Sequence, residues 1–545
     1  MNKLFFIFFT IFFSYLNIGI CNRTSEKSIK ETSSNEDLNV NITALIFTSD
    51  TKKLVNDPSI YTGIVINNTF VPDKNVFVKK FSSYLHEPIT LETLDKIKME
   101  VTSFYNERNY PFVSVLIPSG QDITTGNVKV LIITSKVGNV KVEGTKYFSG
   151  KRILDEITLK KGDVLNYNKM LKDISWINES PFLNSFFLLE EGEKFGTTDL
   201  VVKVNEKFPL RVYAGYENTG NLIAGNNRIL TGFNLGNVFG KNQLNYQFMS
   251  AADLDKWQGH SASYIIPFKW RHIFKIFGAY VSIKDPNGDY LLKGHAKQLS
   301  GRYTIPIYAN KIKHNIILGY DFKRANNFLD FSQRLNFLND IDISQFIIGY
   351  ELLYKYVAFR NMNYISPGGM TKNNHTADFT NIRPGAKANY FYSTLSLDAS
   401  VYMPRNFSYV FSSSFQVSNQ KLMPCEQFIL GGYYTVRGYR ENESISDFGI
   451  LLKNEIRTPP INLLRIKRND IQFLAFWDFG TGFQSDKTIL FHSSEVLTSL
   501  GAGVRYNIKD NFNARFDVGF PLTKINRKDD INSRYNTHFG VYLAF

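Results

Sequence analysis

Two short motifs hold the residues whose types and spacing point most clearly to an interaction. Residues 431–439 read Gly-Gly-Tyr-Tyr-Thr-Val-Arg-Gly-Tyr, so that one arginine, Arg437, stands among glycine, aromatic and apolar residues. About forty residues later, residues 476–480 read Phe-Trp-Asp-Phe-Gly, with the acid Asp478 among aromatics. A guanidinium and a carboxylate form charge-assisted hydrogen bonds, often two in parallel. The motifs therefore indicate an ion pair between a loop and a strand, unless Arg437 is a solvated loop residue.

Residue types used by metalloenzymes and hydrolases are present, but their spacing does not indicate catalysis. The chain has 8 histidines without the His-Glu-x-x-His spacing of zinc proteases. It has no Gly-x-Ser-x-Gly nucleophile motif and no nucleotide-binding loop. We therefore expect no enzyme, no metal and no cofactor, and interpret each histidine as an ordinary strand or loop residue. They are His86, His260, His272, His295, His314, His375, His492 and His538.

The formal net charge of +14 raises the question of nucleic-acid binding. The 63 lysines and arginines are spread along the chain and often alternate with apolar residues. No run of them resembles a nucleic-acid-binding arm. We interpret them as solvated faces and as the lining of a polar lumen, so no nucleic acid is expected among the partners.

Residues 1–21 are typical of a signal peptide. Lys3 supplies a positive charge, and residues 4–16 form an apolar core too short to span a bilayer. The residues before Cys21 favour cleavage after it, although a lipid anchor on Cys21 is the alternative. After cleavage Cys425 alone remains of the 2 cysteines, so that no intrachain disulfide is possible.

Residues 22–206 divide into a polar leader and two modules of similar order. Residues 22–59 are polar with few apolar anchors, and we expect a flexible segment. Residues 60–135 and 136–206 each follow the order strand, helix, helix, strand, strand, which is enough for one sheet covered by two helices. The expected strands are 63–70, 112–117, 128–134, 137–142, 186–190 and 200–204, and the expected helices are 76–85, 91–104, 148–157 and 167–177.

From residue 207 to residue 545 the apolar period changes to two. In residues 512–520 the even positions are apolar, whereas the odd positions are polar or glycine and include Arg515 and Asp517. The mean hydropathy is only −0.20, and after the signal peptide no run of 18 apolar residues exists that would predict a transmembrane helix. Long strands with one apolar and one polar face, in an exported chain, favour a closed membrane barrel.

We therefore expect a transmembrane β-barrel of 16 antiparallel strands over residues 207–545, preceded by two α+β domains. Fifteen strands are recognisable, and a sixteenth is expected at residues 357–366 because bacterial barrels close with an even number. The fifteen begin near residues 208, 228, 242, 261, 273, 298, 312, 344, 388, 407, 449, 471, 498, 512 and 535.

Strand parity places Asp478 inside this barrel. In residues 471–480 the odd positions are apolar and form the face towards lipid, so Asp478 points into the lumen together with Gln472. A carboxylate on the lipid face would be costly. Arg437 lies in the long connection 421–447, so the pair can form only if this loop folds back into the lumen.

At this point the chain resembles the two-partner secretion transporters of the haemolysin secretion/activation type, a branch of the POTRA-plus-barrel outer-membrane superfamily. The resemblance covers nearly everything after residue 60, where the two modules resemble POTRA domains 1 and 2. Residues 196–202 resemble the family's sequence motif before the barrel. Residues 449–457 resemble the family's strand after the sixth loop.

Three motifs carry this resemblance. The run Val436-Arg437-Gly438-Tyr439 is similar to the family's signature on the inward-folding sixth extracellular loop. Phe476 and Gly480 flank Asp478 in a barrel-wall motif whose aspartate pairs with that arginine. The C-terminal run, with Gly540, Leu543 and Phe545, resembles the outer-membrane assembly signal.

The resemblance implies a translocation pore in the cell outer membrane, with its POTRA domains in the periplasm. Its partner would be an unfolded exoprotein, β-helical once folded, which is recognised by the POTRA domains and secreted without ATP. Arg437 and Asp478 would act as a conformational lock. Outer-membrane lipids and the barrel-assembly machinery would be further partners.

Several alternatives stay open at this stage. A factor for assembly or insertion of outer-membrane proteins belongs to the same superfamily, although its members usually carry more POTRA domains. A passive porin would need no such modules. The family's N-terminal plug helix and Pro-rich linker are not recognisable, so the resemblance leaves open whether the lumen is plugged at rest.

Overall fold

The computed structural model describes residues 40–50, 61–221, 224–284, 293–309, 312–329, 335–462, 469–485, 492–525 and 534–545. The predicted signal peptide 1–21 and most of the predicted flexible segment 22–59 lie outside these residues. The chain forms two compact units, one ending at Thr134 and the other beginning at Ser135. Among the described helices, none is long and apolar enough to cross a membrane.

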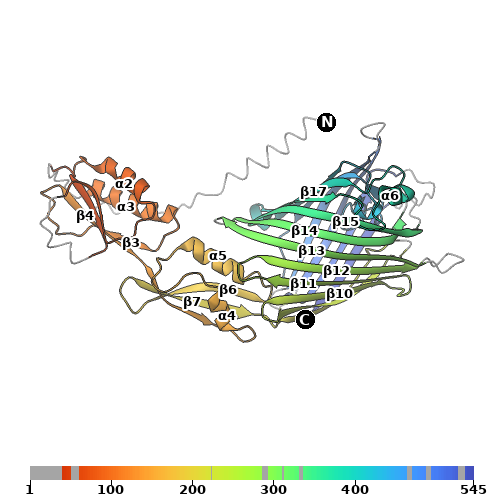
Figure 1. The fold of residues 1–545 in the computed structure, drawn as a ribbon, viewed down its shortest axis with the longest axis horizontal. Coiled ribbons are helices and arrows are strands. Elements are labelled where there is room, and N and C mark those ends of the chain that lie inside the picture. The colour runs from red at the N-terminus through yellow and green to blue at the C-terminus, as the bar shows by residue number, and fades with distance from the viewer. Residues whose placement is uncertain are drawn as a thin grey trace. The chain divides into compact units, whose positions relative to one another are not determined.

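The first unit contains a four-stranded sheet with two helices on one face (Figure 1). The helices bury a row of phenylalanines, Phe77, Phe81 and Phe104, against the sheet. The Thr90 side chain accepts a hydrogen bond from the Thr93 backbone N–H at 3.1 Å and so caps α3. In sheet order the strands are β2 (Gly63–Asn67), β1 (Ala44–Thr48), β4 (Asn127–Thr134) and β3 (Val113–Leu116); the helices are α2 (Lys74–Phe81) and α3 (Leu91–Glu107), with the short helix η2 (Ser82–Tyr84) between them.

Strand β1 corrects the expectation of a flexible segment over residues 22–59. It pairs in parallel with both β2 and β4, and all five of its residues are buried. A central strand covered on both faces has no alternating pattern, so its short apolar run does not stand out from the polar residues around it. The prediction is therefore wrong for residues 44–48, and the module contains one strand more than expected.

The second module is a three-stranded sheet with two helices. In sheet order its strands are β5 (Lys136–Glu143), β7 (Thr197–Glu206) and β6 (Leu183–Glu191), and its helices are α4 (Gly150–Asp155) and α5 (Tyr167–Ile177). Strands β5 and β7 run parallel, whereas β6 is antiparallel to β7. In the described part of the chain β6 pairs with β7 alone, so that its other edge is open.

Three acidic residues of this module reach three successive connections of the barrel. The buried Asp173 of α5 accepts a hydrogen bond from Arg271 Nη2 at 2.5 Å, and Arg271 has a left-handed backbone with φ of 67°. Glu156 pairs with Lys241. Glu179 pairs with Lys313 and accepts a hydrogen bond from Tyr308 Oη at 2.9 Å. Burial raises the pKa of the Glu156 carboxyl, although Lys241 opposes the shift.

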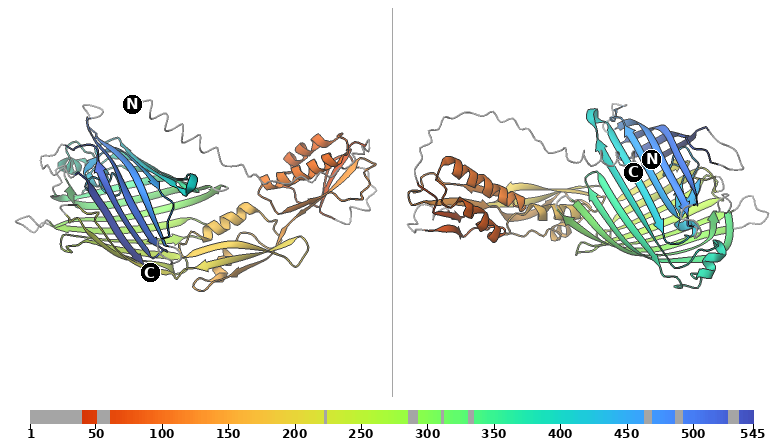
Figure 2. Two further views of the ribbon diagram at one scale, coloured as in Figure 1. Left: turned by 180° about the vertical axis from the view of Figure 1, so that it is seen from behind. Right: turned by 90° about the horizontal axis from the view of Figure 1, so that it is seen from above.

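The strands of the second unit curl into a barrel (Figure 2). The barrel closes between its last and first strands, where Ala544 is paired with Tyr213. All sixteen expected strands are present, which confirms the predicted fold class. They are β8 (Leu210–Glu217), β9 (Arg228–Val238), β10 (Asn242–Ala251), β11 (Trp257–Pro267), β12 (Ile273–Lys284), β13 (Lys293–Ala309), β14 (Ile312–Leu329), β15 (Leu335–Tyr354), β16 (Val357–Ser366), β17 (Tyr390–Tyr402), β18 (Ser408–Ser418), β21 (Phe448–Arg457), β22 (Asn469–Gln484), β23 (His492–Ile508), β24 (Phe512–Pro521) and β25 (Asn536–Ala544).

Two connections at the end away from the second module fold inwards. Loop five, residues 367–389, contains the helix α6 (Thr376–Ile382), and loop six, residues 421–447, contains a small hairpin of β19 (Phe428–Leu430) and β20 (Ser444–Ser446). Phe379 of loop five and Val436 of loop six are fully buried. The remaining short helices are η3 (Pro404–Asn406) and η4 (Pro424–Glu426).

Candidate functional site

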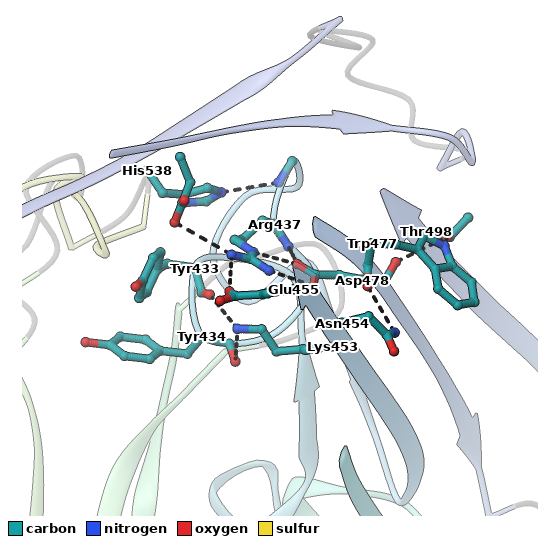
Figure 3. Close-up of polar contacts among 12 residues, drawn as sticks. Tyr433, Tyr434, Arg437, Lys453, Asn454, Glu455, Trp477, Asp478, Thr498 and His538 are labelled. Carbon is teal, nitrogen blue, oxygen red and sulfur yellow. Dashed lines mark hydrogen bonds and ion pairs between the residues drawn. The ribbon is translucent and has the colours of Figure 1, made fainter. Parts of the chain in front are cut away.

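The structure brings Arg437 of loop six onto Asp478 of β22 (Figure 3). Nε of Arg437 donates to Oδ2 of Asp478 at 2.7 Å, and Nη2 donates to Oδ1 at 2.9 Å. The backbone N–H of Arg437 also donates to Oδ2, at 3.1 Å. The exposed fraction is 1% for Arg437 and 0% for Asp478. The ion pair predicted from strand parity is therefore present, bidentate and buried.

The alternation along β22 explains why Asp478 faces the lumen. Phe473 and Trp477 are exposed on the outer face, whereas Leu474, Phe476 and Asp478 are buried on the inner face. The ring of Phe476 lies under the guanidinium, with the Arg437 Cζ atom 3.6 Å from its centroid. A cation over an aromatic face adds electrostatic attraction. Phe476 and Asp478 therefore both contact the Arg437 side chain.

Two further carboxylates share Arg437. Nη1 donates to Oε1 of Glu455 on β21 at 2.6 Å and lies 3.8 Å from Oδ2 of Asp517 on β24. Each acid has a second cation, since Glu455 pairs with Arg457 and Asp517 pairs with Arg505. One loop side chain is thus held by three strands.

Sequence reasoning missed the sharing of Arg437 by these two acids. The lumen-facing parity of Asp517 is readable from its strand, but the register between strands is not. In the structure Lys453 lies opposite Asp478, which brings Glu455 opposite Phe476. The distance from Glu455 to Arg437 follows from this pairing and from the path of the loop.

The electrostatics of the cluster favour a charged Arg437. Burial lowers the pKa of its guanidinium, but the three carboxylates outweigh this effect, so the pKa lies above its usual range. Glu441 of the same loop behaves differently: burial raises the pKa of its carboxyl to about 7, although the backbone N–H of Tyr433 and the cations Lys453 and Arg515 oppose the shift.

The other signature residues seat the loop against the wall. Gly438 has φ of 92°, and a Cβ atom there would lie 2.9 Å from the backbone carbon of Gly519 on β24. A Cβ at Gly480 would lie 2.8 Å from Cγ2 of Val436. The Tyr439 hydroxyl donates to the carbonyl oxygen of Thr498 at 2.9 Å. Both glycines therefore allow a close approach that any larger residue would block.

Cations and aromatics surround the tip of the loop. Lys453 Nζ donates to the carbonyl oxygens of Tyr433 at 3.1 Å and Tyr434 at 3.2 Å (Figure 3). The backbone N–H of Gly438 donates to Nε2 of His538 at 3.3 Å. The Arg515 Cζ atom lies 3.7 Å from the ring centroid of Tyr433. These contacts fix the backbone on either side of Arg437.

The predicted assembly-signal residues lie on the closing strand. Leu543 and Phe545 are exposed, whereas Gly540 is paired with Glu217 of the first barrel strand. The backbone of Phe545 exchanges two hydrogen bonds with Val212, at 3.0 and 2.9 Å. These residues take part in closing the barrel, and their reading as an assembly signal stays a prediction.

Among the described residues, no group of three or more His, Cys, Asp or Glu side chains is arranged to hold a metal ion. The site is a network of charged side chains around loop six. A barrel preceded by POTRA-like modules, with such a loop inside, defines a class of outer-membrane pore.

The family comparison agrees with this class. Residues 196–506 match the model described as haemolysin secretion/activation protein ShlB/FhaC/HecB, and residues 135–207 match the POTRA model described as surface antigen variable number repeat. The chain belongs to the haemolysin secretion/activation protein family. It is a two-partner secretion transporter whose barrel lies in the outer membrane and whose POTRA domains lie in the periplasm.

Individual relatives are distant but match along most of their length. The heme/hemopexin transporter protein HuxB of Haemophilus influenzae strain 86-028NP is 21% identical over 482 residues, 84% of this chain and 82% of its own. The outer membrane transporter CdiB-2 of Burkholderia pseudomallei strain 1026b is 22% identical over 506 residues, 83% of this chain and 81% of its own.

The fold is also similar to solved structures. CdiB from Escherichia coli superposes with a TM-score of 0.75 at 15% identity, covering 96% of this chain and 93% of that one. CdiB from Acinetobacter baumannii gives a TM-score of 0.66 at 16% identity and covers 100% and 97%. At these identities the likeness concerns the fold alone.

Proposed function

We propose that this pore exports one unfolded partner exoprotein and that the Arg437 cluster keeps loop six and the barrel seam in a working conformation. The observation that carries the proposal is the buried ion pair between loop six and the wall. Because Arg437 also contacts Glu455, the tip of loop six is held to two neighbouring strands of the wall. This part of the loop can be released without unfolding the barrel.

Capture of the partner is assigned to the open edge of β6. An extended chain can add to a sheet edge through backbone hydrogen bonds, which tolerate many side-chain sequences. Phe186 and Leu188 on this strand are 49% and 41% exposed. They offer apolar contacts to alternate residues of an added strand, as a partner that later folds into a β-helix would present.

Movement through the lumen needs no nucleotide in this proposal. The sequence has no nucleotide-binding loop. Lumen-facing polar residues such as Gln298, which is paired with Lys323, can solvate an extended chain along the barrel wall. Folding of the partner outside the cell then makes each step harder to reverse.

Arg437 and Asp478 act as a conformational lock rather than as a catalytic pair, and no catalytic role is assigned to any residue. Before the lock can work, the barrel must reach the outer membrane. Gly540, Leu543 and Phe545 are proposed to present the closing strand to the barrel-assembly machinery, while exposed residues such as Trp477 contact outer-membrane lipids.

The kind of cargo is proposed from the similarity of this chain to its relatives. One relative is named as a heme/hemopexin transporter protein and another as an outer membrane transporter. We infer a large exoprotein as the cargo of this chain, without assigning its activity.

The test is deletion of this protein, followed by mass spectrometry of the culture medium and of the outer membrane. Loss of one large secreted protein, with outer-membrane barrels at normal levels, is the expected result. Loss of many barrel proteins would support the alternative function, an assembly or insertion factor. Complementation with the intact chain is the control.

A further inference from the structure

Loop five forms an apolar core with the barrel wall. Phe379 and Ala386 of this loop are fully buried and belong to one cluster with Ile341 and Ile343 of β15. The cluster joins loop five, strands β14, β15 and β17, and the start of loop six. Its buried members are Ala325, Ile341, Ile343, Phe379, Ala386, Ala388, Tyr390, Tyr392, Leu422 and Met423.

The isoleucines of this cluster face the lumen. Ile343 is paired with Lys323 of β14, whose amine reaches Glu426 of loop six inside the barrel. Side chains of this kind would be in contact with water if the lumen were open at this height. Covering them is favourable because apolar surface leaves water. The inward position of loop five therefore keeps this apolar surface away from water.

A second ion pair, between the partly buried Arg383 and the buried Asp447, joins loop five to the end of loop six. Arg383 Nη1 donates to Oδ1 of Asp447 at 2.5 Å, and Nη2 donates to Oδ2 at 2.9 Å. Asp447 is fully buried and also accepts the backbone N–H groups of Leu422 at 2.9 Å and Ser485 at 2.8 Å. Arg383 donates to the Leu422 carbonyl oxygen at 2.5 Å. The Asp447 carboxylate, at the end of loop six, is thus hydrogen-bonded to the start of the same loop and to the connection after β22.

The opposite part of loop five is fixed to the wall. Thr371 Oγ1 donates to Oδ2 of Asp342 at 2.8 Å, and Arg324 pairs with the same carboxylate. Asn374 Nδ2 donates to the Asp342 carbonyl oxygen at 2.8 Å. Loop five is therefore held to β15 on one side and to loop six on the other.

We propose that loop five and the base of loop six form a single outer closure of the pore, in which Arg383 and Asp447 are the positioning residues. The inference rests on the pore function proposed above but not on the role of Arg437. The two anchors share no residue, because Arg383 and Asp447 contact Leu422, Gln427, Gln484 and Ser485, whereas Arg437 contacts Glu455, Asp478 and Asp517. Breaking the outer anchor opens the outer part of the lumen while the tip of loop six stays docked.

The experiment measures closure rather than export. Full-length variants Arg383→Met, Asp447→Asn and the double substitution are inserted in the outer membrane and compared with Lys372→Ala, an exposed cation of the same loop. A membrane-impermeant maleimide is added outside the cells, and labelling of Cys425, whose thiol is exposed inside the barrel beside Lys323, is followed by mass spectrometry. Purified proteins are also studied in planar bilayers.

The three anchor variants should label Cys425 faster by about tenfold or more, because hydrogen bonds to a charged group are lost. They should also show longer conducting states, whereas Lys372→Ala should match the parent. The double variant distinguishes loss of closure from loss of folding. It lacks the contact but leaves no unpaired charge buried, so the barrel should still form. Parent-like labelling and conductance would overturn the proposal, and so would failure of the double variant to form a barrel.

The result separates this proposal from the function of the pore. If deletion of this chain leaves every secreted protein in the medium, the proposed export function is wrong, while the closure measurement stays valid. A chain that exports its partner but shows parent-like closure in all three variants would sink the outer closure alone.

Discussion

Replacement of Arg437 gives the sharpest prediction from the site. The Asp478 carboxylate accepts three hydrogen bonds from Arg437, two of them from the side chain. Arg437→Ala removes these two and the contact to Glu455, so that buried carboxylates lose their shared cation. Removal of one partner from a buried pair costs about 3–5 kcal/mol.

This cost applies to the docking of loop six rather than to the whole barrel. At about 1.4 kcal/mol for each factor of ten, the ratio of docked to released loop should fall roughly a hundredfold to a few thousandfold. Arg437→Lys should lie between the parent and Arg437→Ala, because an ammonium keeps the charge but cannot form the planar two-bond contact. Arg440→Ala, three residues away in the same loop, is the matched control.

The assay has two readouts at equal outer-membrane levels of each variant. Secretion of the partner should be lost or sharply reduced in Arg437→Ala, because the released loop no longer holds a working pore. Limited proteolysis should cut within residues 431–439 much faster than in the parent. Normal secretion by Arg437→Ala, with the barrel inserted, would refute the role of Arg437 as a lock.

Three other predictions follow from contacts of the second unit. Gly519→Ala should release loop six as Arg437→Ala does, because its Cβ would lie 2.5 Å from a backbone nitrogen of the loop; Gly278→Ala, whose Cβ meets nothing closer than 3.8 Å, should change nothing. Arg271→Ala should raise hydrogen exchange in α5, because the buried Asp173 loses a charged partner worth about 1–3 kcal/mol; unchanged exchange would show that this contact does not hold the module. For Glu441, the folded pKa of about 7 lies above the ordinary value of about 4.3, so docking is strongest below the ordinary value and weakens as pH rises through about 7. Thermal melting from pH 4 to 9 should show this loss, and Glu441→Gln should remove it; the same slope in the variant would exclude Glu441 as its source.

Much of the barrel was predictable from sequence because a barrel strand carries its own signal. Alternation of apolar and polar residues gave the inward face of Asp478, and the structure confirms it, since Trp477 is exposed and Asp478 is buried. The closing strand pairs with the first strand as a closed barrel requires. The ends of the strands were predicted less accurately than their existence. For example, β15 begins at Leu335 instead of near residue 344.

What could not be predicted depends on contacts between distant segments. Strand β1 has no alternation because all five of its residues are buried, on both faces of the sheet. Arg383 and Asp447 lie on two loops and are 64 positions apart in the sequence, and neither residue lies in a motif. The inward position of loop five could have been predicted from the isoleucines of β15, because apolar side chains on a lumen face must be covered by another part of the chain.

The measurement that tests the central claim most directly is export by the purified chain alone. The protein is reconstituted in liposomes without nucleotide, and the unfolded partner identified by the deletion experiment is added on the POTRA side. The account predicts that the partner becomes protected from protease inside the liposomes, while an unfolded barrel protein offered in parallel does not insert. Insertion of the barrel protein without protection of the partner would contradict the account.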